Sequence, residues 1–188
     1  AITAQNTIGV QSIYPLPKEI VMEQINSITT DLSPDIVKIG MLADLDIIEY
    51  ISKKISNYKI VLDPVMVATS GDVLVSDEVV SSIKNNLINK SFLITPNIYE
   101  AEILSENKIN CLEDQIEAGK NLLKLGCKHV LVKGGHGNSE IINDVLITSS
   151  GDEYIFESKK IISKNTHGTG CSLASAIATN IGLGNDIK

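Results

Sequence analysis

Five stretches of the chain carry apolar residues at steps of three and four, which is the spacing of one face of an α-helix. Four short apolar runs, rich in β-branched residues, alternate with these stripes at residues 36–39, 60–62, 92–94 and 130–132. Runs this short are typical of strands buried on both faces of a parallel sheet. The alternation of strand and helix therefore predicts βαβ units and an α/β fold. The stripes are Val21, Ile25, Ile28 and Leu32; Ile47, Ile51 and Ile55; Val80, Ile83 and Leu87; Ile116, Gly119 and Leu123; and Ala174, Ile177, Ala178 and Ile181.

The pattern changes toward the carboxyl end. Two apolar runs, 145–147 and 154–156, flank the turn-forming residues 149–152 (SSGD), which predicts a hairpin at the edge of the sheet. The chain has 188 residues and shows no repeat, linker or low-complexity segment. We therefore expect one domain over residues 1–188.

Composition narrows the function classes. Sixteen Lys and Arg stand against 23 Asp and Glu, a formal net charge of −7, and there is no Trp. Without a basic run or interleaved aromatics, binding of nucleic acid is not expected. No stretch approaches the ~20 apolar residues of a membrane helix. The three cysteines, Cys111, Cys127 and Cys171, show no C-x-x-C spacing, which favours a reducing compartment. We expect a cytoplasmic protein with a small-molecule substrate and no membrane contact.

Polar residues follow each of the predicted parallel strands. Asp63 comes directly after one strand, Asn97 follows another with Glu100 one turn later, and Lys133 follows a third. Because the carboxyl ends of parallel strands share one edge of a sheet, these side chains should converge there. Two carboxylates, an amide and a lysine suit a magnesium–polyphosphate ligand, since carboxylates hold Mg²⁺ directly or through water and lysine offsets phosphate charge.

Each of these residues also has a purely structural interpretation. Asp63, which precedes Pro64, could initiate a turn. Asn97 could be a helix N-cap, with Glu100 completing a capping box. Lys133 could be a solvated strand end. Four such positions on one predicted edge favour a site over four separate coincidences.

A second candidate lies at residues 165–171 (NTHGTGC), which open the last predicted helix. Two glycines let backbone amides crowd around an anion, and the amino end of a helix adds partial positive charge. Cys171 would lie in the first turn, where a thiol ionises more readily and could accept a proton from a hydroxyl. The alternative is a tight turn with Cys171 as a small packed residue. The segment is neither a Walker A loop nor a G-x-G-x-x-G motif.

The remaining histidines and cysteines indicate less. His129 begins a buried strand and is interpreted as structural, while His136 and His167 lie beside glycines and could touch phosphate. Cys111 and Cys127 flank a predicted helix and are expected to be packed thiols. No Cys/His spacing fits zinc.

Six motifs, in this order and at this spacing, resemble one known family. They are AQNT (4–7), KIGML (38–42), DPVMV (63–67), TPN (95–97), VKGGH (132–136) and NTHGTGC (165–171). Together they resemble hydroxymethylpyrimidine/phosphomethylpyrimidine kinase, a thiamine-biosynthesis member of the ribokinase-like superfamily. The cysteine that ends the last motif is the most specific feature, because ribokinase-like sugar kinases usually carry aspartate there. The resemblance implies a three-layer fold, a mostly parallel sheet with helices on both faces.

The resemblance also implies an activity and residue roles. The expected reaction is ATP- and Mg²⁺-dependent phosphorylation of 4-amino-5-hydroxymethyl-2-methylpyrimidine and of its monophosphate. Gln5 and Met41 would contact the pyrimidine. The metal would be organised by Asp63 and Glu100, partly through water, with Asn97 in support. The other implied roles are nucleotide contacts for Asn97, Lys133, Thr166 and His167, an anion hole from Gly168, Thr169 and Gly170, and a general base at Cys171.

Some features depart from the family pattern and keep alternatives open. Family members usually begin with a strand and a glycine-rich segment before the position of Ala1 and continue further at the carboxyl end, so we expect an incomplete sheet. Thr69 stands where a lysine is frequent in a loop that could close over the phosphates. The alternatives are a pyridoxal kinase of the same superfamily and a non-catalytic ligand-binding fragment. A homodimer is plausible by analogy with relatives.

Overall fold

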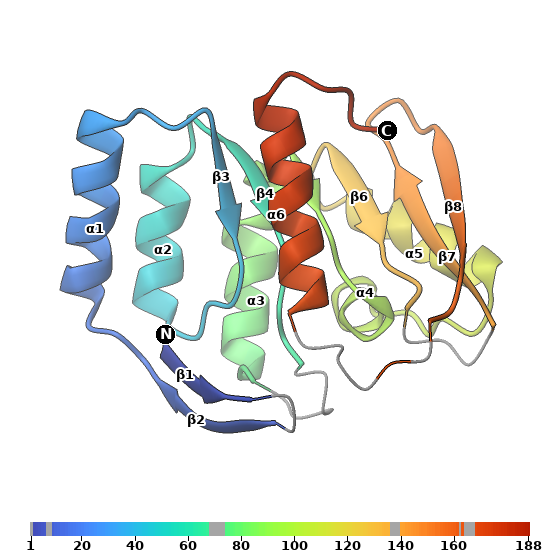
Figure 1. The fold of residues 1–188 in the computed structure, drawn as a ribbon, viewed down its shortest axis with the longest axis horizontal. Coiled ribbons are helices and arrows are strands. Elements are labelled where there is room, and N and C mark those ends of the chain that lie inside the picture. Colours follow the sequence, from blue (N-terminus) through green and yellow to red (C-terminus); the bar gives the residue numbers. More distant parts are fainter. Residues whose placement is uncertain (1, 7–8, 68–73, 136–139, 162, 164–167) are drawn as a thin grey trace.

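A six-stranded sheet forms the centre of the molecule (Figure 1). The computed structural model describes residues 2–6, 9–67, 74–135, 140–161, 163 and 168–188. The strands are hydrogen-bonded in sequence order, with the first four parallel and the last three joined by antiparallel pairing. They are β3 (Ile36–Ile39), β4 (Lys59–Leu62), β5 (Leu93–Ile94), β6 (His129–Val132), β7 (Ile141–Ile147) and β8 (Glu153–Lys159).

The register brings the carboxyl ends of the parallel strands level with one another. Ile39 pairs with Leu62, Leu62 with Ile94, and Ile94 with Val130. The residues that follow these strands therefore emerge along one edge. The predicted edge hairpin is confirmed as β7 and β8, which are longer than expected and turn at Gly151, where φ is 86°.

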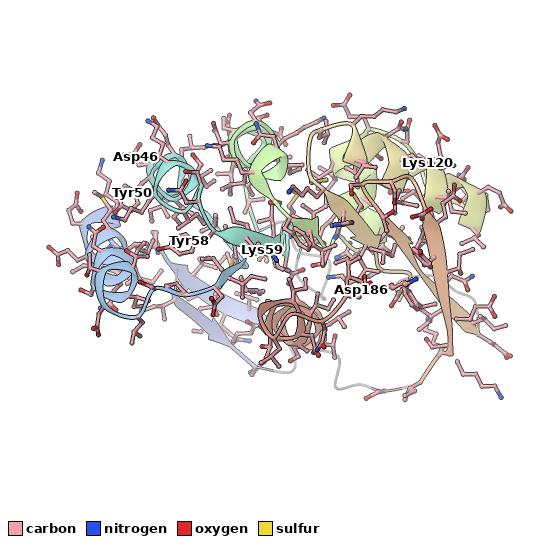
Figure 2. All side chains as sticks on the ribbon, turned by 90° about the horizontal axis from the view of Figure 1, so that it is seen from above. Asp46, Tyr50, Tyr58, Lys59, Lys120 and Asp186 are labelled. Carbon is pink, nitrogen blue, oxygen red and sulfur yellow. The ribbon has the colours of Figure 1, made fainter. Side chains whose placement is uncertain are left out.

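Helices cover both faces of the sheet, so the three-layer α/β fold is confirmed (Figure 2). Buried residues of α2, α3, α4 and α5 share one core cluster with one face, whereas α6 packs on the other. The helices are α1 (Lys18–Asp31), α2 (Leu45–Lys54), α3 (Asp77–Asn86), α4 (Ile98–Ser105), α5 (Leu112–Leu123) and α6 (Thr169–Gly182), with a 3₁₀ turn at Ile88–Lys90.

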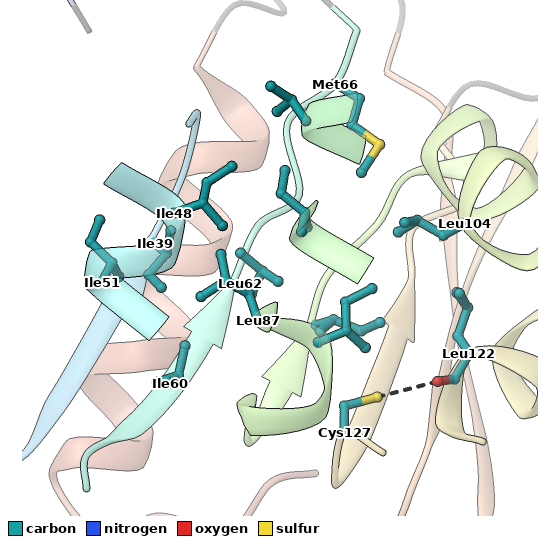
Figure 3. Close-up of a cluster of buried hydrophobic side chains, with 14 of the residues drawn as sticks. Ile39, Ile48, Ile51, Ile60, Leu62, Met66, Leu87, Leu104, Leu122 and Cys127 are labelled. Atoms are coloured by element: carbon teal, nitrogen blue, oxygen red, sulfur yellow. Dashed lines mark hydrogen bonds between the residues drawn. The ribbon is translucent and has the colours of Figure 1, made fainter. Parts of the chain in front are cut away.

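Strand alternation divides the core into two clusters. In β4, Ile60 and Leu62 face the layer of α2 to α5, and Val61 between them faces α6. Figure 3 shows the larger cluster, where the Cys127 thiol donates to the carbonyl oxygen of Leu122 at 3.5 Å. Burial raises the pKa of Cys127 to about 12, so this thiol is packed, as expected. Cys111 instead is exposed, because it stands at the N-cap of α5, so its predicted packing is wrong.

The amino-terminal part departs most from the sequence expectation. Two short strands, β1 (Ile2–Gln5) and β2 (Val10–Tyr14), form a separate antiparallel hairpin that the apolar pattern did not indicate. The first predicted helix is present as α1, but it buries no residue fully and packs beside α2, where the Tyr50 hydroxyl donates to Asn26 Oδ1 at 3.1 Å. Among the described residues, no helix is long and apolar enough to span a membrane.

Candidate active site at the carboxyl edge of the sheet

A buried aspartate and a lysine meet where β4 and β6 end. Asp63 follows β4 and is 2% exposed, and Lys133 follows β6. Lys133 Nζ lies 3.0 Å from Asp63 Oδ1, and the Thr95 hydroxyl donates to the same oxygen at 3.2 Å. The two side chains are 70 positions apart in sequence and meet because parallel strands deliver both to one edge. Lys133 is therefore an ion-pair partner and not a solvated strand end.

A second lysine, Lys38, joins this pair. The sequence pattern gave it no role of its own beyond its place in the KIGML motif (38–42). Lys38 Nζ lies 3.7 Å from Asp63 Oδ2, so the carboxylate is flanked by two ammonium groups. Lys38 lies within β3, a strand with no exposed residue. A lysine inside such a strand needs a partner for its charge, which is the signal that could have identified it.

Asn97 and Glu100 form the capping box that their spacing suggested. Asn97 Oδ1 accepts from the Glu100 amide at 2.9 Å, and Glu100 Oε2 accepts from the Asn97 amide at 2.8 Å. Glu100 Oε1 also accepts from the Met66 amide at 3.3 Å, which joins α4 to the segment after β4. Burial raises the pKa of Glu100 to about 7, against the opposing effects of the Asn97 amide and of Lys133.

The amino end of α6 approaches the lysine–aspartate pair. Gly168 is the N-cap residue with φ at 78°, and the Ser172 amide donates to its carbonyl oxygen at 2.9 Å. A Cβ at Gly170 would lie 3.3 Å from Lys133 Nζ, so the glycine backbone and the ammonium group are neighbours. Cys171 lies in the first turn and is exposed. Thr169 is the first residue of the helix, whereas Thr166 and His167 lie outside the described residues.

The residues expected to contact the substrate ring are less closely tied to this cluster. Met41 is half-buried and comes two residues after β3, at the same sheet edge. Gln5 is exposed at the end of β1, beside an irregularity in the hairpin register. The hairpin lies toward the end of the molecule to which β3 points (Figure 1).

The acidic groups suit a metal ion bound through water. Both oxygens of Glu100 accept backbone amides, and both oxygens of Asp63 face lysines. Asp63 Oδ1 also accepts from Thr95, so capacity for a further donor remains on the two Glu100 oxygens and on Asp63 Oδ2. Mg²⁺ usually retains several waters, which could donate to these oxygens. Among the described residues, no three His, Cys, Asp or Glu side chains cluster closely enough to enclose an ion directly.

Comparisons with known proteins show the family to which this chain belongs. A family model described as phosphomethylpyrimidine kinase matches residues 1–188. The chain is 42% identical to a hydroxymethylpyrimidine/phosphomethylpyrimidine kinase of Bacillus subtilis, covering 100% of this chain and 70% of that protein. A crystal structure of phosphomethylpyrimidine kinase from Clostridium difficile superposes with a TM-score of 0.83 at 37% identity, covering 98% of this chain and 76% of the other.

A third relative lies within the same structural class. The ADP complex of Bacillus subtilis pyridoxal kinase superposes with a TM-score of 0.86 at 30% identity, covering 100% of this chain and 70% of that one. The fold is that of the ribokinase-like kinases. Within that class, the chain belongs to the phosphomethylpyrimidine kinase family. The predicted family, fold and phosphotransferase class are confirmed.

Proposed function

We propose that this chain transfers the γ-phosphoryl group of ATP to the hydroxymethyl oxygen of 4-amino-5-hydroxymethyl-2-methylpyrimidine, and then phosphorylates the resulting monophosphate. The observation that carries the proposal is the meeting of the Asp63–Lys133 pair with the glycine-lined amino end of α6. The substrate is suggested by the names of the relatives that share this family. The proposed place of the reaction is the cytoplasm, in thiamine biosynthesis.

Phosphoryl transfer depends mainly on positioning and on charge stabilisation, and these groups can supply both. Lys133 would offset the negative charge of the ATP phosphates. Backbone amides of Gly168, Thr169 and Gly170 would surround the transferred group at a helix amino end, where the helix dipole favours negative charge. Asn97, Thr166 and His167 are proposed nucleotide contacts, and Gln5 and Met41 are proposed pyrimidine contacts.

Asp63 and Glu100 would hold Mg²⁺ through water, with Asn97 capping the helix that carries Glu100. When bound, the metal neutralises charge on the phosphates and orients them. The lysine–aspartate contact keeps Asp63 in place whether or not the ion is present.

Cys171 would act as general base in the first transfer. Its thiolate would take the proton of the hydroxymethyl group while that oxygen forms its bond to the γ-phosphorus and the bond to ADP breaks. The second acceptor differs chemically, because a phosphate monoester already carries an ionised oxygen near neutral pH. A base is therefore needed more for the first transfer than for the second.

Replacement of Cys171 tests this assignment. Cys171→Ala should lower kcat of the first transfer by about 100-fold or more, the usual size of a general-base contribution, while the KM of the alcohol changes little. The second transfer should fall less. Cys111→Ala is the matched control, since this thiol is also exposed and also near the amino end of a helix, and it should leave both steps unchanged. Equal turnover of Cys171→Ala and wild type would remove the base role.

Pyridoxal kinase activity is the second candidate, because a solved pyridoxal kinase superposes over the whole chain with a TM-score of 0.86. The phosphate machinery would be shared, and the ring contacts near Gln5 and Met41 would decide between the alcohols. A side-by-side measurement of kcat/KM for pyridoxal and for the pyrimidine alcohol separates the two. We expect the pyrimidine to be preferred. ATP-independent binding with no transfer to either alcohol would favour a ligand-binding role instead.

A further inference from the structure

Lys38 lies on the α6 side of the sheet, together with Asp63 and Lys133. Side chains alternate along a strand, so Lys38 shares its face with Ile36, which belongs to the cluster under α6. The same alternation places Asp63 on the face of Val61, and Lys133 on the face of Leu131. Three parallel strands thus contribute one charged residue each to the same side of the same edge.

Among Lys38, Asp63 and Lys133, the positive charges outnumber the negative charges by one. Asp63 provides one negative charge between two ammonium groups, at 3.0 Å from Lys133 Nζ and 3.7 Å from Lys38 Nζ. One carboxylate is enough to balance one lysine. Glu100 also lies near Lys133 and Asp63. Removal of Lys38 makes the local net charge more negative by one, whether the Glu100 carboxyl group is protonated or ionised.

The contact of Lys38 with Asp63 leaves its donors available. A separation of 3.7 Å is an ion pair but is too long for a hydrogen bond. Among the described residues, no hydrogen bond from Lys38 Nζ is found, although an ammonium group carries three donors. The Lys38 side chain is 20% exposed. A Cβ on Gly40 would lie only 2.9 Å from Lys38 Nζ, so a larger residue there would crowd the ammonium group. Gly40 thus leaves the ammonium group room at the open edge of the sheet.

We infer that Lys38 is a second phosphate-binding cation of this site, whose ammonium group donates to a phosphate oxygen while Asp63 holds it beside Lys133. This extends the proposed function, since the phosphate could belong to the nucleotide or to the monophosphate acceptor. A neutral side chain in β3 would leave Lys133 alone to serve both the buried carboxylate and the ligand.

The test compares Lys38→Met and Lys38→Gln with Lys38→Arg. Loss of the charge should weaken the binding of inorganic pyrophosphate by about tenfold, as expected for one charge near a partly buried anion. The slope of log Kd against log salt should also become shallower, whereas Lys38→Arg should stay near wild type. Lys53→Met is the control, because Lys53 is an exposed lysine that pairs with Glu49 on α2.

Steady-state kinetics distinguish the two sources of phosphate. A raised KM for ATP in Lys38→Met indicates the nucleotide, and a raised KM for the monophosphate but not for the alcohol indicates the acceptor. An unchanged pyrophosphate affinity, or a Lys38→Arg variant as weak as Lys38→Met, would overturn the inference. So would failure of both neutral variants to fold, which would assign Lys38 to stability alone. If wild type binds pyrophosphate but phosphorylates neither alcohol, the proposed function fails and the binding result still stands.

Discussion

Glu100 shows how one buried carboxyl group can make the stability of this protein depend on pH. Burial raises its pKa from 4.5 to about 7 in the folded chain. Between these values the folded state holds the Glu100 proton more tightly than the unfolded state does. The stabilising contribution is therefore fully present below pH 4.5, declines as the pH rises, and is lost above about pH 7.

We expect the contribution of Glu100 to the free energy of unfolding to fall by up to about 3 kcal/mol across this window. Urea denaturation at pH 5, 6, 7 and 8 measures the decline. Glu100→Gln should flatten it, even though Gln satisfies only one of the two amide donors. Glu102→Gln is the control, because the pKa of Glu102 is lowered and its titration lies below the window. Equal slopes in wild type and Glu100→Gln would contradict the prediction.

Single residues differ in how far their position in the structure could be predicted from the sequence. Asp63 and Lys133 follow apolar strands, and Asn97 and Glu100 have capping-box spacing, so local pattern was sufficient for their placement. Lys38 could be singled out as a lysine within a buried strand, but its partner could not, because the pairing of β3 with β4 brings Asp63 to it. That pairing is a tertiary property, which one apolar run does not encode.

The close approach of β7 to the end of β6 fixes the backbone that carries Lys133. The Gly134 amide donates to Asp144 Oδ1 at 2.8 Å, and a Cβ on Gly134 would overlap the carbonyl oxygen of Asn143. Among the described residues, nothing lies within 4 Å of such a Cβ at Gly135. Gly134 is thus required by packing between elements, whereas Gly135 meets no such contact from the part of the chain that the structure describes.

The two glycines provide a matched pair of variants. Gly134→Ala should destabilise the fold by about 1–3 kcal/mol through overpacking, and it should raise the KM for ATP because Lys133 is displaced. Gly135→Ala should change both quantities little. Chemical denaturation and steady-state kinetics on the two variants measure this. Similar effects of the two substitutions would show that β7 does not hold the end of β6 in place.

Elements with a strong apolar period were predicted well, and elements without one were missed. The central strands and five of the helices appear where the pattern placed them. The β1–β2 hairpin forms its own two-stranded sheet and has no fully buried residue, so no alternating apolar face marks it. Helix α4 has only eight residues, and its N-cap was the main local signal for it.

At the scale of the whole molecule, the central sheet packs against helices on both faces, and the apolar cluster under α6 is less closely packed than the cluster on the opposite face. Leu122 of α5 is fully buried in the larger cluster. Leu131 of β6 belongs to the smaller cluster and borders an open pocket of about 230 Å³ beside α6, lined also by Leu146, Leu173 and Ile177. Since both clusters pack on the same strands, we expect the chain to unfold as one domain.

A pair of leucine truncations tests this expectation on the intact chain. Leu122→Ala should cost toward the upper end of the ~2–5 kcal/mol range for buried leucines, because its removal leaves a new cavity. Leu131→Ala should cost toward the lower end, because the adjacent pocket already deprives this side chain of neighbours. Both variants should keep a single transition, with far-UV circular dichroism and tyrosine fluorescence changing together. Separate transitions would mean that the two layers unfold independently and would contradict the single domain. A larger loss for Leu131→Ala than for Leu122→Ala would contradict the looser packing beside α6.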